Sequence, residues 1–200
     1  YTDLADSLAP RLAAIENRDS FETTRLYDRN GRLLYEFFDA GKRTRVPIDQ
    51  ISTNLISATV AIEDSTFFEN RGVDYLGIAR TLWTSLQAGE ETGGASTITQ
   101  QVIKNIVLSD EERLYENRYQ RKITEIILAQ ELSERYEKPE ILELYLNEIY
   151  YGNLAYGIEA AANVYFDVSA NNLDLPQSAL LAGLAQLPSV YDPINYLDGG

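Results

Sequence analysis

The residues with the clearest chemical potential form a polar run in the middle of the chain. The run contains hydroxyl, carboxamide and ammonium side chains, those of Ser96, Thr97, Thr99, Gln100, Gln101, Lys104 and Asn105. Ser and Thr prefer helix caps and turns, so such a run is atypical of a helix that packs in a core. The alternative is a polar loop that leads into a capped helix. The length and order of the run favour a functional site over this alternative.

A second candidate is the adjacent pair Glu63 and Asp64, which follows the apolar run 58–62. A carboxylate that emerges from a hydrophobic support can gain proton affinity and serve as a base. The alternative is a helix C-terminus that continues into a solvated acidic turn. This segment alone leaves both interpretations open.

A third candidate combines Arg121, Lys122 and Glu125, which lie three and four residues apart on a predicted helix and therefore share a face. Such spacing usually indicates a helical ion pair, worth about 0.3–0.5 kcal/mol. Together with Lys104, however, the two cations make a basic cluster in an acidic chain, as the binding of a pyrophosphate would require.

Composition removes several other chemistries. The chain contains no Cys and no His, which excludes a thiol nucleophile, an imidazole base and a zinc site built on thiolate or imidazole ligands. Asp, Glu, Lys and Tyr remain for acid–base work. The formal net charge of −14 argues against a nucleic-acid partner, which needs a basic face. No apolar run reaches the roughly 18 residues of a membrane span, and the absence of Met predicts a piece of a longer protein.

The elements that position these residues are predicted to be mainly helical. A helix at 3–17, interrupted at Pro10, precedes a β-hairpin at 24–38 and a third short strand at 44–46. Helices are then predicted from about residue 54, after a cap at Asp74, and at 112–137, 140–149, 156–166 and 176–187, the last capped by Asp174. The helix after Asp74 carries Leu76, Leu82, Trp83 and Leu86 on one face. Residues 88–95 are the expected mobile segment.

The motifs resemble those of a known family. The run 93–105 resembles the second signature of the peptidoglycan glycosyltransferases, the lysozyme-like family that polymerises lipid II and forms the N-terminal catalytic domain of class A penicillin-binding proteins. The segment 63–74 resembles the first signature, Glu-Asp-x-x-Phe-x-x-His-x-Gly, except that Asn70 occupies the His position. The segment 121–125 matches the third signature, Arg-Lys-x-x-Glu, and 138–152 and 179–188 resemble the fourth and fifth.

This resemblance implies a fold and a set of residue roles. The implied fold is mainly α, a lysozyme-like helical domain of two lobes at 51–200, preceded by a helix and β-hairpin region at 1–50. Glu63 is implied as the catalytic base and Glu125 as a second catalytic residue. The implied substrate-binding residues are Asp64, Ser96, Thr97, Thr99, Gln100, Gln101, Lys104, Asn105, Arg118, Arg121 and Lys122. A further family Arg corresponds to Arg113 or Arg118, of which we favour Arg118.

The resemblance also implies an activity and its partners. We expect inverting glycosyl transfer at the outer face of a bacterial cell membrane, from a growing glycan chain to lipid II. Moenomycin-type inhibitors, a transpeptidase domain in the same parent chain and an anchoring helix outside this fragment are expected as well. A divalent cation such as Mg²⁺ is expected near Glu125, and no organic cofactor.

Two other functions compete with this prediction. A lysozyme-like hydrolase also places a Glu after a helix, but a neutral glycan offers nothing for a cluster of cations. A non-catalytic glycan-binding module would have Asn70 as its first sign of decay, yet Glu63, Lys104, Lys122 and Glu125 are all retained.

Overall fold

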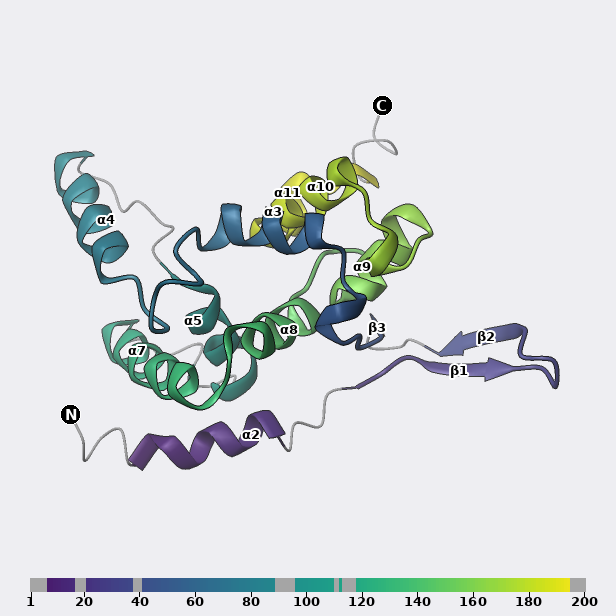
Figure 1. Ribbon diagram of the computed structural model, residues 1–200, viewed down its shortest axis with the longest axis horizontal. Coiled ribbons are helices and arrows are strands. Elements are labelled where there is room, and N and C mark those ends of the chain that lie inside the picture. The colour runs from purple at the N-terminus through teal and green to yellow at the C-terminus, as the bar shows by residue number, and fades with distance from the viewer. Residues whose placement is uncertain are drawn as a thin grey trace. The chain divides into compact units, whose positions relative to one another are not determined.

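A computed structural model describes residues 7–16, 21–37, 41–88, 96–109, 112 and 118–194 (Figure 1). Within these residues the chain is mainly helical with a small strand component, which confirms the predicted fold class. Unit 1 comprises Tyr1–Arg18 and Val60–Tyr145, and unit 2 comprises Asp19–Thr59 and Leu146–Gly200. These two compact units cut across the predicted division after residue 50, and that division stays a prediction.

Unit 1 holds the polar run and most of the candidate site residues. Its elements are η1 (Ala9–Leu12), α2 (Ala13–Glu16), the end of α3 (Thr53–Glu63), α4 (Tyr75–Ala88), α5 (Ile98–Val102), the π-helical turn η3 (Ile103–Val107), α7 (Arg118–Arg135) and most of α8 (Lys138–Glu148). Helix α5 packs on α7, η1 also packs on α7, and α2 packs on η3. Buried apolar side chains of α5, α7 and α8 form the core, among them Ile98, Leu128, Leu132, Ile141 and Leu142.

Local capping explains where the helices of unit 1 begin. The Asp74 carboxylate accepts from the Gly77 N–H at 2.9 Å, so the predicted cap of α4 is confirmed. Thr97 caps α5, because its hydroxyl accepts from the Gln100 N–H while the Gln100 side chain accepts from the Thr97 N–H. The polar run therefore contains a helix start. Thr97 and Gln100, the two residues that form the cap, are both buried.

The apolar face of α4 lies at the surface. Leu76, Trp83 and Leu86 are 78%, 62% and 81% exposed. These three side chains are not part of the core, so ordinary packing does not explain their apolar character. The side chain of Leu82 lies outside the described part of the structure.

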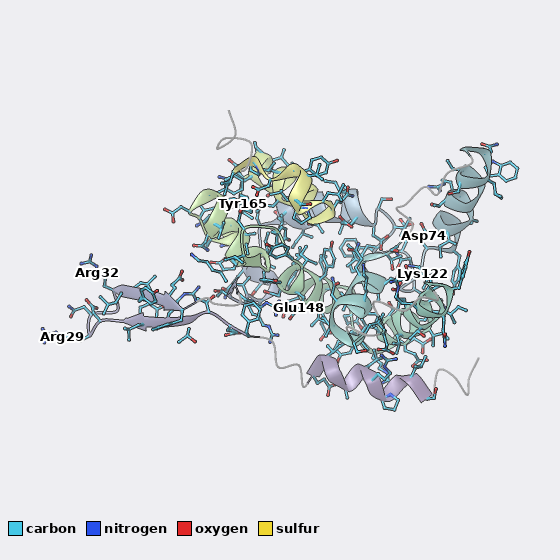
Figure 2. All side chains as sticks on the ribbon, turned by 180° about the vertical axis from the view of Figure 1, so that it is seen from behind. Arg29, Arg32, Asp74, Lys122, Glu148 and Tyr165 are labelled. Atoms are coloured by element: carbon cyan, nitrogen blue, oxygen red, sulfur yellow. The ribbon has the colours of Figure 1, made fainter. Side chains whose placement is uncertain are left out.

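Unit 2 contains the predicted hairpin. Strands β1 (Thr24–Tyr27) and β2 (Leu33–Phe37) pair antiparallel, and Arg29 and Arg32 lie at the tip of this hairpin (Figure 2). The third strand was predicted at 44–46, which is wrong: β3 covers Lys42–Arg43 and pairs in parallel with β4 (Ala155–Tyr156). Val46 does not extend the strand, because its N–H and C=O both bond to the side-chain amide of Asn147.

The remaining elements of unit 2 are short helices. They are η2 (Ile48–Gln50), α9 (Ile158–Phe166), η4 (Ala170–Asn172), α10 (Leu175–Gln186) and α11 (Pro188–Tyr191). The predicted cap of α10 is confirmed, because the Asp174 carboxylate accepts from the Gln177 N–H at 2.9 Å. Buried side chains of Ile51, Leu55, Ile158, Leu181 and Leu184 belong to the core of this unit.

Some predicted boundaries fall partly outside the described residues. The long helix predicted at 112–137 is α7, which begins at Arg118, and residues 113–117 are not described. The predicted mobile segment 88–95 lies outside the described residues from position 89 onward. No described helix is both long enough and apolar enough to span a lipid bilayer.

Candidate active site

Glu63 ends α3 and is half-buried. Its Oε2 accepts a hydrogen bond from the Gln101 Nε2 at 2.7 Å. Gln101 belongs to α5, and its Oε1 lies 3.5 Å from the Tyr145 hydroxyl of α8. The carboxylate therefore has a fixed orientation, because a side chain that is itself held from another helix holds one of its oxygens.

A hollow of about 180 Å³ lies beside Glu63. Three segments of unit 1 line it: residues 61–66, the first half of α4, and Ser96 with Thr97. Arg80 and Thr81 line it from α4, and sequence reasoning missed both. Gly77 lines it as well, and a Cβ at this position would lie 2.3 Å from the Asp74 carboxylate.

Asp64 differs sharply from its neighbour. It is 7% exposed and accepts from the Thr66 hydroxyl at 3.1 Å, the Asn70 amide at 3.0 Å and the Ile98 N–H at 3.2 Å. These donors occupy the acceptor positions of both oxygens, so the carboxylate has little capacity left for a ligand. Both adjacent acids line the hollow, but the oxygens of Asp64 are engaged by donors of the surrounding fold.

The polar run divides in the same way. Thr97, Thr99 and Gln100 are buried, whereas Ser96 and Asn105 are exposed and Gln101 is half-buried. The Thr97 hydroxyl donates to the Gly72 carbonyl at 2.6 Å. Gly72 has φ +86° and a Cβ there would lie 2.3 Å from the Ala129 carbonyl oxygen, so only glycine lets this loop approach α7. The substrate-binding role predicted for the three buried residues stays a prediction.

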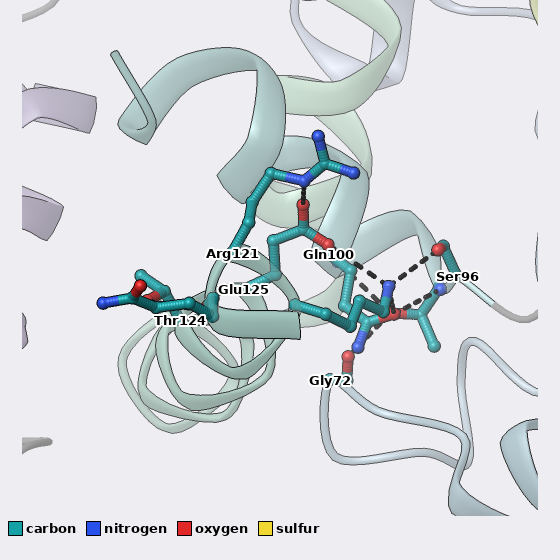
Figure 3. A network of polar contacts seen from close by, with 9 residues as sticks. Gly72, Ser96, Gln100, Arg121, Thr124 and Glu125 are labelled. Atoms are coloured by element: carbon teal, nitrogen blue, oxygen red, sulfur yellow. Dashed lines mark hydrogen bonds and ion pairs between the residues drawn. The ribbon is translucent and has the colours of Figure 1, made fainter. Parts of the chain in front are cut away.

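Lys122 and Glu125 of α7 belong to a polar network. Figure 3 shows Glu125 in this network with Arg121, Gln100 and Ser96. The Lys122 Nζ lies 2.8 Å from the Ser96 hydroxyl, 3.3 Å from the Gln100 Oε1 and 3.2 Å from the Glu125 Oε2. The Arg121 Nε lies 3.4 Å from the other Glu125 oxygen. Glu125 is only 4% exposed, so one buried carboxylate holds two cations at the edge of the polar run.

The structure links this network to Glu63. Ser96 lines the hollow that Glu63 also lines, and its hydroxyl contacts Lys122. Helix α5 completes the link, because Gln100 contacts Lys122 and the next residue, Gln101, contacts Glu63. The sequence predicted that the base and the cations belong to one site, and the geometry brings Glu63 and Lys122 together in this way.

Other predicted cations are less well placed. Lys104 is exposed on η3, and it does not line the hollow. Arg118 opens α7, but its side chain and the whole of Arg113 lie outside the described residues. The choice between these two arginines stays a prediction.

The residues around Glu125 do not fit a divalent cation. Each of its oxygens faces a cationic side chain, and the described residues contain no group of three or more acidic side chains that could hold a metal ion. A metal prefers several oxygen ligands and would be repelled by two neighbouring cations. The expected Mg²⁺ stays a prediction.

These features describe a helical domain in which the oriented carboxylate of Glu63 lies at a polar hollow and a cluster of cations lies nearby. Such an arrangement can accept a proton and bind an anionic group. The family model described as Transglycosylase matches residues 30–199. The chain belongs to this family, and the predicted class, a peptidoglycan glycosyltransferase, is confirmed.

Curated relatives support the same assignment. Penicillin-binding protein 1A of Escherichia coli (strain K12) is 42% identical over 175 residues, which are 86% of this chain and 20% of that protein. Penicillin-binding protein 1A of Aquifex aeolicus is 41% identical over 196 residues, 98% of this chain and 26% of the relative. Penicillin-binding protein 1A/1B of Bacillus subtilis is 40% identical over 191 residues, which are 95% of this chain and 20% of the relative. The chain thus spans about a fifth to a quarter of these relatives.

Proposed function

We propose that this domain polymerises lipid II into glycan strands by inverting transfer, with Glu63 as the general base. The growing chain, held as its lipid pyrophosphate, is the donor, and lipid II is the acceptor. Glu63 takes the proton of the acceptor 4-hydroxyl while that oxygen attacks the anomeric carbon of the donor. The bond from this carbon to the pyrophosphate breaks, and the pyrophosphate leaves with the electron pair. The geometry parallels an inverting glycosidase with a sugar hydroxyl in place of water.

The observation that carries this proposal is the state of the carboxylates at the hollow. Asp64 and Asp74 line it with Glu63, but Asp64 accepts three kinds of donor and Asp74 caps α4. Among the described carboxylates that line the hollow, Glu63 is therefore the best suited to proton transfer. A glycosidase needs a second carboxyl group as an acid for its leaving group. A pyrophosphate leaves as an anion and needs none. A single suitable carboxylate among the described residues of the hollow therefore favours transfer over hydrolysis.

Positive charge on the leaving side supplies the second part of the chemistry. Lys122 and Arg121, with Lys104 and Arg118 as further candidates, would stabilise the charge that develops on the pyrophosphate. The three donors of the Lys122 ammonium face Ser96, Gln100 and Glu125. Gln100 and Glu125 are buried and Ser96 is exposed, so the Ser96 contact is the one that a phosphate oxygen would replace. Glu125 then acts by holding both cations in place.

The setting of the reaction follows from the lipid substrates. The exposed apolar face of α4 is suited to contact the outer leaflet or the lipid chains of the substrates. We expect the parent chain to carry a membrane anchor and a transpeptidase domain, because the curated relatives are penicillin-binding proteins of which this domain is a fraction. Moenomycin-type phosphoglycolipids would compete for the cationic side of the site.

A gel assay with labelled lipid II tests this function. Ladders of glycan product are expected, and purified peptidoglycan incubated with the domain should release no fragments. Fragments without ladders would establish the hydrolase instead. If neither ladders nor fragments form, the non-catalytic binding module is the remaining interpretation. A parallel reaction with chelator checks the metal requirement. Full activity in the presence of chelator would contradict the expectation that Mg²⁺ is required.

A further inference from the structure

Asn70, the position where the sequence departs from the family signature, uses both polar atoms of its side chain. Its Nδ2 lies 3.0 and 3.1 Å from the two Asp64 oxygens. Its Oδ1 accepts from the Gly72 N–H at 3.0 Å and from the Lys138 ammonium at 3.2 Å. This arrangement fixes the amide orientation, because the reversed amide would direct its NH₂ at an ammonium and its oxygen at a carboxylate.

Lys138 supplies a half-buried positive charge that the reaction scheme does not use. It opens α8, its side chain is half-buried, and its Nζ lies 4.6 Å from the ring centre of Phe67. Phe67 is fully buried. Burial lowers the pKa of Lys138, and the charge of Asp64 acts in the opposite direction. The neutral amide of Asn70 thus lies between a half-buried ammonium and a buried carboxylate.

The other end of this arrangement holds the start of α5. Asp64 accepts from the N–H of Ile98, the first residue of α5. The carbonyl of Gly72 accepts from the hydroxyl of Thr97, the cap of the same helix. Asn70 bonds to both Asp64 and Gly72. It therefore bonds to both of the residues that hold this helix end, to Asp64 through its carboxylate and to Gly72 through its N–H.

Helix α5 in turn sets the position of the base. Gln101 lies three residues beyond Ile98 on this short helix, and its Nε2 holds the Glu63 carboxylate at 2.7 Å. A shift of the helix start would move Gln101 relative to Glu63. Displacements of about an ångström can reduce turnover substantially when they affect a reacting group.

We propose that Asn70 and Lys138 are positioning residues of glycosyl transfer. They fix Asp64 and Gly72, which hold the start of α5, and thereby maintain the hydrogen bond from Gln101 to Glu63. The inference rests on the proposed function and adds a property to it. A carboxamide offers a donor and an acceptor at every pH, whereas an imidazole offers both only when it is neutral. In this chain the position of the base is therefore independent of pH over the range in which histidine titrates.

The absence of histidine from the chain makes a direct test possible, because Asn70→His introduces the only imidazole. The charged groups that face position 70 are Asp64 from its own segment and Lys138 from α8. Once protonated, the imidazole can no longer accept from Lys138 or Gly72. We expect kcat of Asn70→His to fall with one added protonation step on the acid side, at the pH where the imidazole NMR resonance titrates.

The matched control is Asn171→His, which places an imidazole at an exposed position of unit 2. Its kcat profile from about pH 5 to pH 9 should superimpose on that of the unsubstituted domain. An Asn70→His profile that also superimposes overturns the proposal, as does an added step in both variants.

A second variant separates positioning from direct binding. Lys138→Met keeps an apolar stem over Phe67 and removes the ammonium, so kcat should fall about tenfold or more with little change in KM for lipid II. A rise in KM at unchanged kcat would show that Lys138 binds substrate and would overturn the positioning role.

Thermal unfolding of Asn70→His and Asn171→His across the same pH range tests the network by its effect on stability, independently of enzyme activity. Only Asn70→His should lose stability as its imidazole becomes protonated, and equal curves would contradict the network. If the unsubstituted domain forms no glycan, the proposed function fails, while this measurement still decides whether the network exists.

Discussion

Each unit contains a buried glutamate that pairs with two cations. The network of unit 2 is closed around Arg43, although its second cation, Arg45, keeps 28% of its side chain exposed, and the network of unit 1 opens to solvent at both cations. In unit 2, the Arg43 guanidinium lies 4.6 Å from the Phe21 ring centre, 5.2 Å from that of Tyr156 and 3.0 Å from the Glu148 carboxylate. In unit 1, Glu125 is equally buried, yet its partners Arg121 and Lys122 keep 29% and 34% of their side chains exposed. Figure 2 labels Glu148 and Lys122, one member of each network.

The difference separates a structural from a functional use of charge. Burial lowers the pKa of Arg43, and aromatic rings occupy the space where a ligand would bind, so this charge serves the fold. The cations of unit 1 have a buried carboxylate on one side and solvent on the other, so they can gain a second anionic partner. Substitutions in the two networks should therefore affect different measurements.

The largest expected effect is on turnover in unit 1. Glu63→Gln keeps the hydrogen-bonding shape of the side chain but cannot accept the proton. Loss of a general base reduces the rate about a hundred- to ten-thousand-fold. Polymerisation of lipid II checks this, and thermal unfolding should be unchanged. Glu69→Gln, at an exposed position of the following turn, is the control and should keep full activity. Turnover of Glu63→Gln within tenfold of the control would remove the base assignment.

Glu148→Gln should show the opposite pattern in unit 2. Glu148 pairs with Arg43 at 3.0 Å and with Arg45 at 3.1 Å, and its removal leaves two guanidinium groups without their counter-charge. The loss in unfolding free energy should be about 3 kcal/mol, measured by denaturant titration beside Asp49→Asn, an exposed control. Activity per folded molecule should remain. Unchanged stability would show that the closed network contributes nothing to the fold.

Lys122→Ala tests the open network itself. It removes a charge-assisted contact to a phosphate group, so binding of a moenomycin-type phosphoglycolipid should weaken about 10- to 100-fold. Calorimetric titration measures this, with Arg135→Ala as the control, because Arg135 is exposed and pairs with Glu131 on the same helix. Equal affinity of the two variants would place the pyrophosphate elsewhere.

Much of the fold could be predicted from local patterns. The hairpin, the Asp74 and Asp174 caps and the helices after them follow from turn residues, capping preferences and periodicity. The third strand was misplaced because the backbone of Val46 finds its partner in the Asn147 side chain. A contact between residues 101 positions apart in the sequence leaves no local signal.

The resemblance to the family signatures pointed to Glu63, Lys122 and Glu125, and their roles stay predictions. Nothing in the local sequence distinguishes the environment of Glu63 from that of Asp64. Their difference arises because the N–H of Ile98, 34 residues away, bonds to only one of them. Arg80 was missed for the same reason, since its place at the hollow depends on how α4 packs.

The exposed apolar face of α4 allows a smaller test of the contrast between the units. Leu86 is 81% exposed in unit 1, and Leu175 is 62% exposed in unit 2. If α4 contacts lipid, Leu86→Ser should weaken binding to vesicles about five- to tenfold, whereas Leu175→Ser should not. Zwitterionic vesicles suit the assay, because a chain of net charge −14 is repelled by anionic ones. Equal vesicle binding by the two variants would contradict the proposal that α4 contacts lipid.

The smallest effect concerns an ion pair that belongs to neither network. Glu36 in β2 lies 2.9 Å from Arg25 and 3.2 Å from Lys42, and the hydrogen bond from Arg25 lowers its pKa from the ordinary value of 4.5. A lowered folded-state pKa stabilises the fold above about pH 4.5, and this contribution is lost as the pH falls through the folded-state value. The pair is partly exposed, so the effect should stay below about 1 kcal/mol. Unfolding free energies of Glu36→Gln and the unsubstituted domain should differ at pH 7 and converge in acid; a constant difference would mean that the glutamate acts through packing.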